Sequence, residues 1–153
     1  MAKNKRNMKI IGRLERIDFP EWDLREIDAK VDTGAYTSSL HCHHITSYQE
    51  SGKDYVKFNL FDPSHETYND KLFKWPVFRK KTIKSSNGSR EARFVIKTKV
   101  RIFDKIFTAE FSLTDRSEMR YPVLLGRKLI NNRFLVDVSQ KYTTNLNAQE
   151  TTK

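Results

Sequence analysis

Apolar and polar residues alternate with a period of two along most of this chain. In the segment DYVKFNLFD, Val56, Phe58 and Leu60 fall on one side of an extended strand and polar residues alternate with them. A helical period is limited to the segment GRKLINNRF, which allows one or two turns at most. The pattern predicts a mainly β protein with one short helix.

Further strands are expected around residues 9–17, 24–32 and 38–45, and a hairpin from Arg93 to Leu113 with Asp104 and Lys105 in its turn. The segments FDPSHETYNDK and SSNGSRE are rich in turn-forming residues and predict loops. The sequence contains no internal repeat and no linker. The length of 153 residues therefore favours one domain over residues 8–138, with flexible tails at 1–7 and 139–153.

The formal net charge of +10 favours a polyanionic partner, such as nucleic acid, the ribosome, anionic lipid or an acidic peptide. Cys42 is the single cysteine, so an internal disulfide is excluded. The first residues lack the apolar core of a secretory signal, and no apolar run approaches the roughly 18 residues of a membrane span. We expect a cytoplasmic protein that does not enter a membrane.

The segment AKVDTGAYTSSLHC places Asp32 directly after an apolar strand and before a Thr33-Gly34 turn. A carboxylate removed from water is costly, so Asp32 is either an ordinary strand cap or a group kept for chemistry. Further along, YPVLLGRKLI predicts a short apolar strand that ends at Gly126 and is followed by a helix. Two apolar strands that each end at a glycine can pack side by side.

As an ordered set, these motifs resemble the retropepsins, the single-lobe aspartic proteases. Within them the chain is similar to a RimB-like bacterial family labelled "putative ATP-dependent zinc protease", some of whose members accompany the glutamate ligase RimK. The matching segments are AKVDTGAYTSSLH, SSNGSREARFVIKT, LTDRSEMRYPVLLGRKLI and FLVDV, which cover most of residues 10–138. The resemblance implies a retropepsin-like closed β-barrel or sheet lobe that forms a two-fold dimer.

The resemblance also implies an aspartic peptidase whose catalytic loop is Asp32, Thr33 and Gly34. One chain offers one such loop, so Asp32 would face Asp32 of a second copy, and the pair would share a proton and activate a water. Within a single chain, the weak candidates for a second acid are Asp115 and Asp137. The residues implied to support the loop are Ala35, Leu124, Leu125 and Gly126.

Charged residues in the family-like segments are candidates for substrate binding, although each could instead be a structural ion-pair partner. They are Glu91, Arg93, Arg116 and Arg127. Because related proteins accompany a glutamate ligase, the resemblance suggests glutamate-rich peptides as substrates. The flap that covers substrate in retropepsins would be one of two loops, 62–70 or 84–91.

The segment HCHH, from His41 to His44, suggests a zinc site, but successive residues of a strand face opposite sides. No face would supply more than two ligands, whereas a catalytic zinc needs three. The sequence also contains no glycine loop for ATP, and the histidines adjacent to Cys42, His41 and His43, would face the opposite side of the strand. We expect no metal, no cofactor and no cysteine nucleophile.

Two other functions remain open from the sequence. The stretch KLFKWPVFRKKTIK interleaves Phe73, Trp75 and Phe78 with basic residues, as an RNA-binding or ribosome-binding surface would. The alternative is a retropepsin-like domain without activity that serves in dimerisation or as an adaptor.

Overall fold

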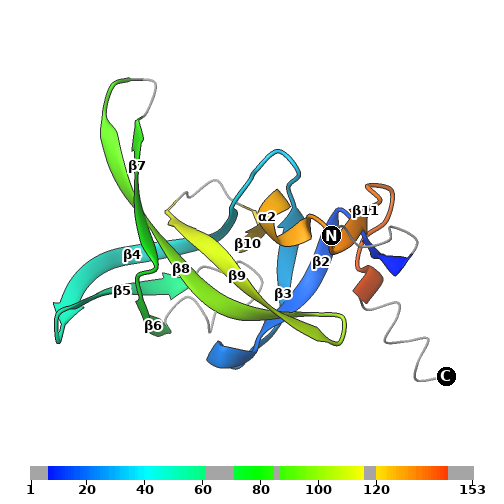
Figure 1. Ribbon diagram of the computed structural model, residues 1–153, viewed down its shortest axis with the longest axis horizontal. Coiled ribbons are helices and arrows are strands. Elements are labelled where there is room, and N and C mark those ends of the chain that lie inside the picture. Colours follow the sequence, from blue (N-terminus) through cyan, green and yellow to red (C-terminus); the bar gives the residue numbers. More distant parts are fainter. Residues whose placement is uncertain (1–6, 61–70, 85–86, 116–119, 145–153) are drawn as a thin grey trace.

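The computed structural model describes residues 7–60, 71–84, 87–115 and 120–144 of the chain (Figure 1). The described part is mainly β, with the short helix α2 (Arg127–Ile130) and the 3-10 turn η2 (Pro20–Trp22). The strands are β1 (Lys9–Ile11), β2 (Leu14–Phe19), β3 (Leu24–Val31), β4 (Ser38–Glu50), β5 (Lys53–Leu60), β6 (Leu72–Pro76), β7 (Arg79–Lys84), β8 (Arg90–Ile102), β9 (Lys105–Thr114), β10 (Val123–Leu125) and β11 (Phe134–Val136).

The main sheet has nine strands, eight of them in the order β10-β3-β2-β8-β9-β4-β5-β6, and β7 pairs with β8 outside this path. Strands β1 and β11 form a separate parallel pair. Figure 1 shows β4 and β5 extending to one end of the molecule, β11 at the other, and the β7–β8 hairpin projecting from the body.

The expectation of a closed barrel is not met by this sheet. Strand β10 pairs with both β3 and β4, a pairing that brings the two ends of the strand order together. Two of the strand pairings needed for closure, however, involve very few residues. Asp18 and Arg101 form the one register pair between β2 and β8, and β10 meets β4 at two pairs. The described strands therefore form a sheet that curves strongly on itself without closing into a barrel. Its long hairpins extend beyond these short pairings.

The core fills the inside of this wrapped sheet with large apolar side chains. Phe19, Phe58 and Phe111 are fully buried, and the ring of Trp22 packs against Phe19 at a centroid distance of 5.2 Å. The predicted alternation in β5 is confirmed, since its alternate apolar side chains are all buried. The β8–β9 hairpin is also present, but its turn is Phe103-Asp104, one residue earlier than expected, because Ile102 pairs with Lys105.

Residues 139–144, which belong to the segment expected to be a flexible tail, contact the body of the protein. Their anchor is Glu15, whose side chain is fully buried and accepts hydrogen bonds from the hydroxyl groups of Thr143 and Thr144. The amides of Gly12 and Thr144 donate to the same carboxylate, at 2.7 and 3.1 Å. This contact between residues far apart in sequence has no local pattern that could have predicted it.

No helix in the described ranges is both long enough and apolar enough to cross a membrane.

Candidate active site

Asp32 lies immediately after β3, at the start of a tight turn. Its amide donates to the carbonyl of Leu125 at 2.9 Å, which continues the pairing of β3 with β10 by one residue. Its carboxylate Oδ1 accepts a hydrogen bond from the Gly34 amide at 3.0 Å, and its carbonyl accepts one from the Ala35 amide at 3.2 Å. Asp32 is half-buried, and its carboxylate is oriented by its own turn.

Strand β10 lies between the two strands that flank this turn. It runs parallel to β3, with Leu125 opposite Val31, and antiparallel to β4, with Leu124 opposite Ser39. Leu125 is fully buried and Leu124 half-buried, so together they support the loop from beneath. The predicted side-by-side packing of the two glycine-ended strands is confirmed.

Gly126 is where α2 approaches the loop most closely. A Cβ at this position would lie 2.7 Å from the carbonyl oxygen of Tyr36 and 2.8 Å from the carbonyl carbon of Thr37, so a side chain does not fit. The Gly126 amide donates to the hydroxyl of Ser38 at 3.0 Å in a buried position. No sequence motif indicated Ser38, whose role depends on this contact with a residue 88 positions away.

Helix α2 fixes the far side of the loop through backbone contacts. The amides of Arg127 and Lys128 donate to the carbonyls of Ala35 and Tyr36, both at 2.9 Å. The Arg127 guanidinium donates to the carbonyl of Thr33 at 2.9 Å. Of the three charged candidates that the structure describes, Glu91, Arg93 and Arg127, it is Arg127 that donates a hydrogen bond to the loop.

The β7–β8 hairpin reaches the other side of the loop. Lys81 on β7 donates to the hydroxyl of Thr37 at 3.4 Å, and Arg93 on β8 is its register partner. Cross-strand partners share a face of a sheet, so Arg93 lies on the face that carries Lys81 to the loop. The Nε atom of Arg93 is buried without a hydrogen-bond partner among the described residues. Sequence reasoning missed Lys81, because its place depends on the hairpin register.

The remaining candidates for substrate binding are less close to the loop. Glu91 is exposed and lies two residues further toward the tip of the hairpin, opposite Ile83. Arg116 lies outside the described residues. Of the two flap candidates, 62–70 also lies outside them, whereas 84–91 belongs, in its described part, to the β7–β8 hairpin.

A buried carboxylate connects the hairpin to α2. Glu110 on β9 is only 10% exposed, accepts a hydrogen bond from Arg79 at 3.0 Å, and pairs closely with the ammonium group of Lys128. Burial raises the pKa of Glu110, but the hydrogen bond and charge of Lys128 and the charges of Arg79 and Lys97 outweigh it, so the pKa is lowered. Glu110 thus joins the base of the hairpin to the helix beneath the loop.

The HCHH segment does not follow the strict alternation expected of a strand. His44 has a left-handed backbone, with φ of 56°, inside an irregularity of the β4–β5 register, and its ring lies 4.7 Å from that of His43. In the described ranges no three His, Cys, Asp or Glu side chains come together as a metal site would require. Burial, followed by the charge of Asp115, raises the pKa of the Cys42 thiol well above its ordinary value.

The two acids considered as partners for Asp32 have other surroundings. Asp137 caps a turn, and its pKa is lowered by the hydroxyl of Ser139, the side-chain amide of Gln140 and the Ser139 backbone amide. Asp115 follows β9 beside His41, whose pKa is lowered by burial although the Thr114 backbone and Asp115 act against this.

The aromatic stretch considered for RNA binding lies largely inside the protein. Phe73 is buried and Trp75 is half-buried against Trp22, with the two indole rings 5.5 Å apart. Phe78 is 49% exposed, and the ammonium group of Lys97 lies 3.9 Å above its ring. Most of the aromatic surface in this stretch therefore serves packing.

Comparison with known proteins identifies the sequence family. A family profile described as RimB-like, "Retropepsin-like aspartic endopeptidase RimB", matches residues 10–146. A crystal structure of a Legionella pneumophila protein with unknown function is similar, with a TM-score of 0.71 and 29% identity, covering 89% of this chain and 98% of that one.

Curated relatives carry a different name. A "Probable alpha-L-glutamate ligase" of Desulfotalea psychrophila is 36% identical over 129 residues, which is 84% of this chain and 28% of the relative. A protein of the same name from Shewanella pealeana is 36% identical over 140 residues, 89% of this chain and 30% of the relative. The chain thus spans less than a third of the length of these relatives.

Proposed function

The chain belongs to the RimB-like family of retropepsin-like aspartic endopeptidases, and from that premise we propose that it hydrolyses peptide amide bonds with a water bound between two Asp32 carboxylates. The observation that carries this proposal is the loop at Asp32. Its carboxylate is oriented by the Gly34 amide, and its backbone is fixed by Leu125 from one side and α2 from the other. An ordinary strand cap would not need support from two separate elements.

The second carboxylate comes from a second copy of the chain. Two carboxylates held this close can share one proton, because the charge of one disfavours ionisation of the other. The ionised one takes a proton from the water as its oxygen attacks the carbonyl carbon, and the protonated one donates to the carbonyl oxygen. Collapse of the tetrahedral intermediate breaks the C–N bond, and the amine leaves with a proton from the pair.

We further propose that the substrate is acidic and rich in glutamate. Lys81, Arg93 and Arg127 place positive charge on both sides of the loop. The relatives named probable alpha-L-glutamate ligase contain a region similar to this chain beside a larger remainder. A domain that removes glutamate residues suits a partner that adds them.

The β7–β8 hairpin is proposed as the flap. It projects from the body of the molecule (Figure 1), and Lys81 contacts Thr37, three residues beyond Gly34. Closure of such a hairpin over a bound peptide would exclude water other than the nucleophile.

The experiment is a comparison of the wild-type protein with Asp32→Asn on a glutamate-rich peptide. The substitution removes one negative charge with little change in shape, so we expect cleavage to be abolished while circular dichroism and the thermal unfolding curve stay close to wild type. A chelator should leave wild-type activity unchanged. Cleavage that survives Asp32→Asn, or that is lost on chelation and restored by zinc, would contradict the proposal.

A further inference from the structure

Two hollows that share the lining residue Phe134 lie near α2. The first, of about 460 Å³, is lined in part by Thr33, Tyr36 and Arg127, so it begins at the catalytic loop. The second, of about 90 Å³, is lined in part by Phe103 and Lys105 at the β8–β9 turn. Phe134 lines both, and it joins them into one surface, which we call the Phe134 strip.

The charge of the strip has one predominant sign. Five of the side chains that line the two hollows are cationic and Asp104 is the single acid among them. Asp104 lies 4.0 Å from Lys9, and the hydrogen bond of Arg127 to Thr33 uses one of the five N–H donors of its guanidinium. The cationic residues are Lys9, Lys105, Arg127, Lys128 and Arg133, of which Lys128 pairs with Glu110 outside the strip.

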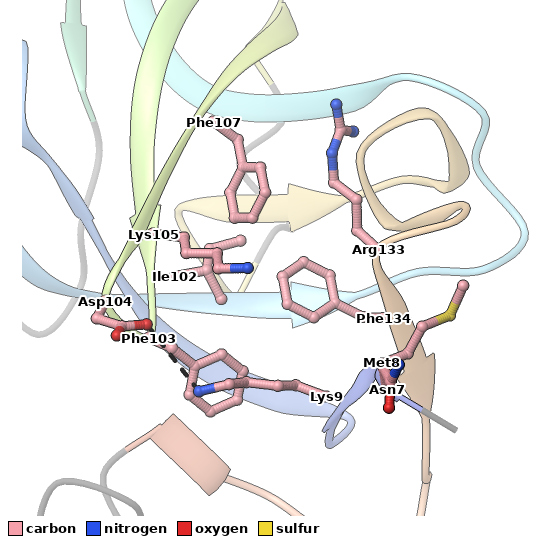
Figure 2. A pocket seen from close by; sticks show the side chains of 10 residues that line it. All are labelled: Asn7, Met8, Lys9, Ile102, Phe103, Asp104, Lys105, Phe107, Arg133 and Phe134. Atoms are coloured by element: carbon pink, nitrogen blue, oxygen red, sulfur yellow. Dashed lines mark ion pairs between the residues drawn. The ribbon is translucent and has the colours of Figure 1, made fainter. Parts of the chain in front are cut away.

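The smaller hollow has an aromatic interior. Figure 2 shows the rings of Phe103, Phe107 and Phe134 around it, with the amine of Lys105 directed toward the space between them. Lys9 extends across the Phe103 ring, with its ammonium group 4.7 Å from the centroid. Apolar walls beneath a cationic rim suit one apolar side chain flanked by carboxylates.

Phe103 occupies an unfavourable backbone conformation. Its φ of 59° lies in the left-handed region, which glycine and asparagine adopt far more readily than an aromatic residue. A two-residue turn would be easier to form with either of those residues. The turn nevertheless carries an aromatic residue, whose ring forms one wall of the hollow. Residues in such backbone conformations cluster at ligand sites.

From these observations we infer that the Phe134 strip binds an acidic peptide segment carrying one apolar side chain, which enters the smaller hollow. Its role as part of the substrate rests on the proposed function. A second copy of this chain is a poor occupant of the strip beyond Thr33, because a two-fold contact through its cationic side chains would set cations against cations. An acidic chain matches the charge along the whole length from Tyr36 to Phe103.

The test measures fluorescence anisotropy with a labelled glutamate peptide that contains one central leucine. We expect Lys105→Glu to weaken binding at least about tenfold, since it reverses a charge at the rim. The matched control is Lys53→Glu, an equal charge change at the exposed β4–β5 turn at the far end of the molecule (Figure 1), which should bind as wild type does. Binding should also weaken as salt rises.

A second variant separates the apolar contact from charge. Phe103→Asn removes the ring but suits the left-handed turn, so the protein should remain folded. Wild-type protein should prefer the leucine peptide to one with serine in its place, and Phe103→Asn should lose that preference. Equal affinity of Lys105→Glu and Lys53→Glu, or of the leucine and serine peptides for wild type, would overturn the inference.

The same peptides are measured on Asp32→Asn to separate this inference from the proposed function. Binding that depends on Lys105 in both backgrounds, with no cleavage in either, would support the strip and contradict the peptidase. If wild type cleaves the peptide and Lys105→Glu cleaves it equally well, the result would support the peptidase and contradict the Phe134 strip. A change in dimerisation by Lys105→Glu in sedimentation would assign the strip to contact between copies and overturn the inference.

Discussion

Gly34 and Gly126 constrain the Asp32 loop in two different ways. At Gly126 an added Cβ would meet backbone atoms of Tyr36 and Thr37 below 3.0 Å, and backbone cannot move aside cheaply. At Gly34 the nearest atom would be Oδ1 of Asp32, at 3.3 Å, which is a side-chain atom that can shift. The lack of a side chain at Gly126 therefore allows α2 to pack against the loop, and the lack of one at Gly34 leaves the Asp32 carboxylate in position.

We predict opposite outcomes for alanine at these two positions. Gly126→Ala should lower the free energy of unfolding by about 2 kcal/mol or more, because the loop and α2 must separate. Gly34→Ala should change it by less than about 1 kcal/mol but lower kcat at least about tenfold, because the displaced carboxylate is misaligned. Urea unfolding and peptide cleavage check both, and a Gly34→Ala protein with full activity would contradict the assigned role of this glycine.

Glu110 gives a pH-dependent prediction. Its pKa is lowered from the ordinary value of 4.5, so its pairing with Lys128 and Arg79 stabilises the folded protein fully above that value and is lost as pH falls through the lowered pKa. Glu110→Gln should cost about 2 kcal/mol near pH 7, and the difference from wild type should shrink as pH falls below 4.5. Urea unfolding across this range checks it, and a difference that is constant with pH would contradict it.

At the level of strands and helices, sequence patterns that are local predicted structure well. Alternation in β5 and in the β8–β9 hairpin follows directly from which side of a strand faces the core. The place of Asp32 after β3 and the short helix after Gly126 follow from single motifs. In each case the residues that determine the structure are neighbours in the chain.

The features that the sequence did not predict all depend on contacts between residues far apart in the chain. The left-handed backbone at His44 breaks an alternation that the letters HCHH could not reveal. Lys81 reaches Thr37 only because the hairpin pairs in one register, and Glu110 meets Lys128 across two elements. The expectation of a closed barrel was wrong because β2 pairs with β8, and β10 with β4, over only one or two residues. The point at which such strands diverge depends on tertiary packing.

The terminal segment anchored by Glu15 gives the prediction at this scale. Truncation after Val138 would remove three of the donors to a fully buried carboxylate, and an unpaired buried acceptor is costly. We expect a loss of about 2 to 3 kcal/mol in the free energy of unfolding, measured in urea. Truncation after Thr144 is the control, because it keeps all three donors, and it should be the more stable of the two. Equal stability of the two truncations would contradict the role given to Glu15.

For the whole molecule, the account depends on assembly. One copy supplies one Asp-Thr-Gly loop, and the two other acids considered in the chain are Asp137, which caps a turn, and Asp115, which lies beside His41. Each copy also carries a formal charge of +10, so two copies repel, and added salt should favour their association. Activity assays of the proposed dimer should therefore be run at moderate ionic strength.

The most direct measurement mixes wild-type protein with Asp32→Asn at constant total concentration, after conditions that allow subunits to exchange. If both carboxylates are required, activity should follow the square of the wild-type fraction, falling to about a quarter of the pure wild-type value in an equal mixture. The control mixture, with Lys53→Glu in place of Asp32→Asn, should keep full activity. An equal mixture with Asp32→Asn that keeps about half the activity, in proportion to the wild-type fraction, would show that each copy acts alone and would contradict a shared pair of Asp32 carboxylates.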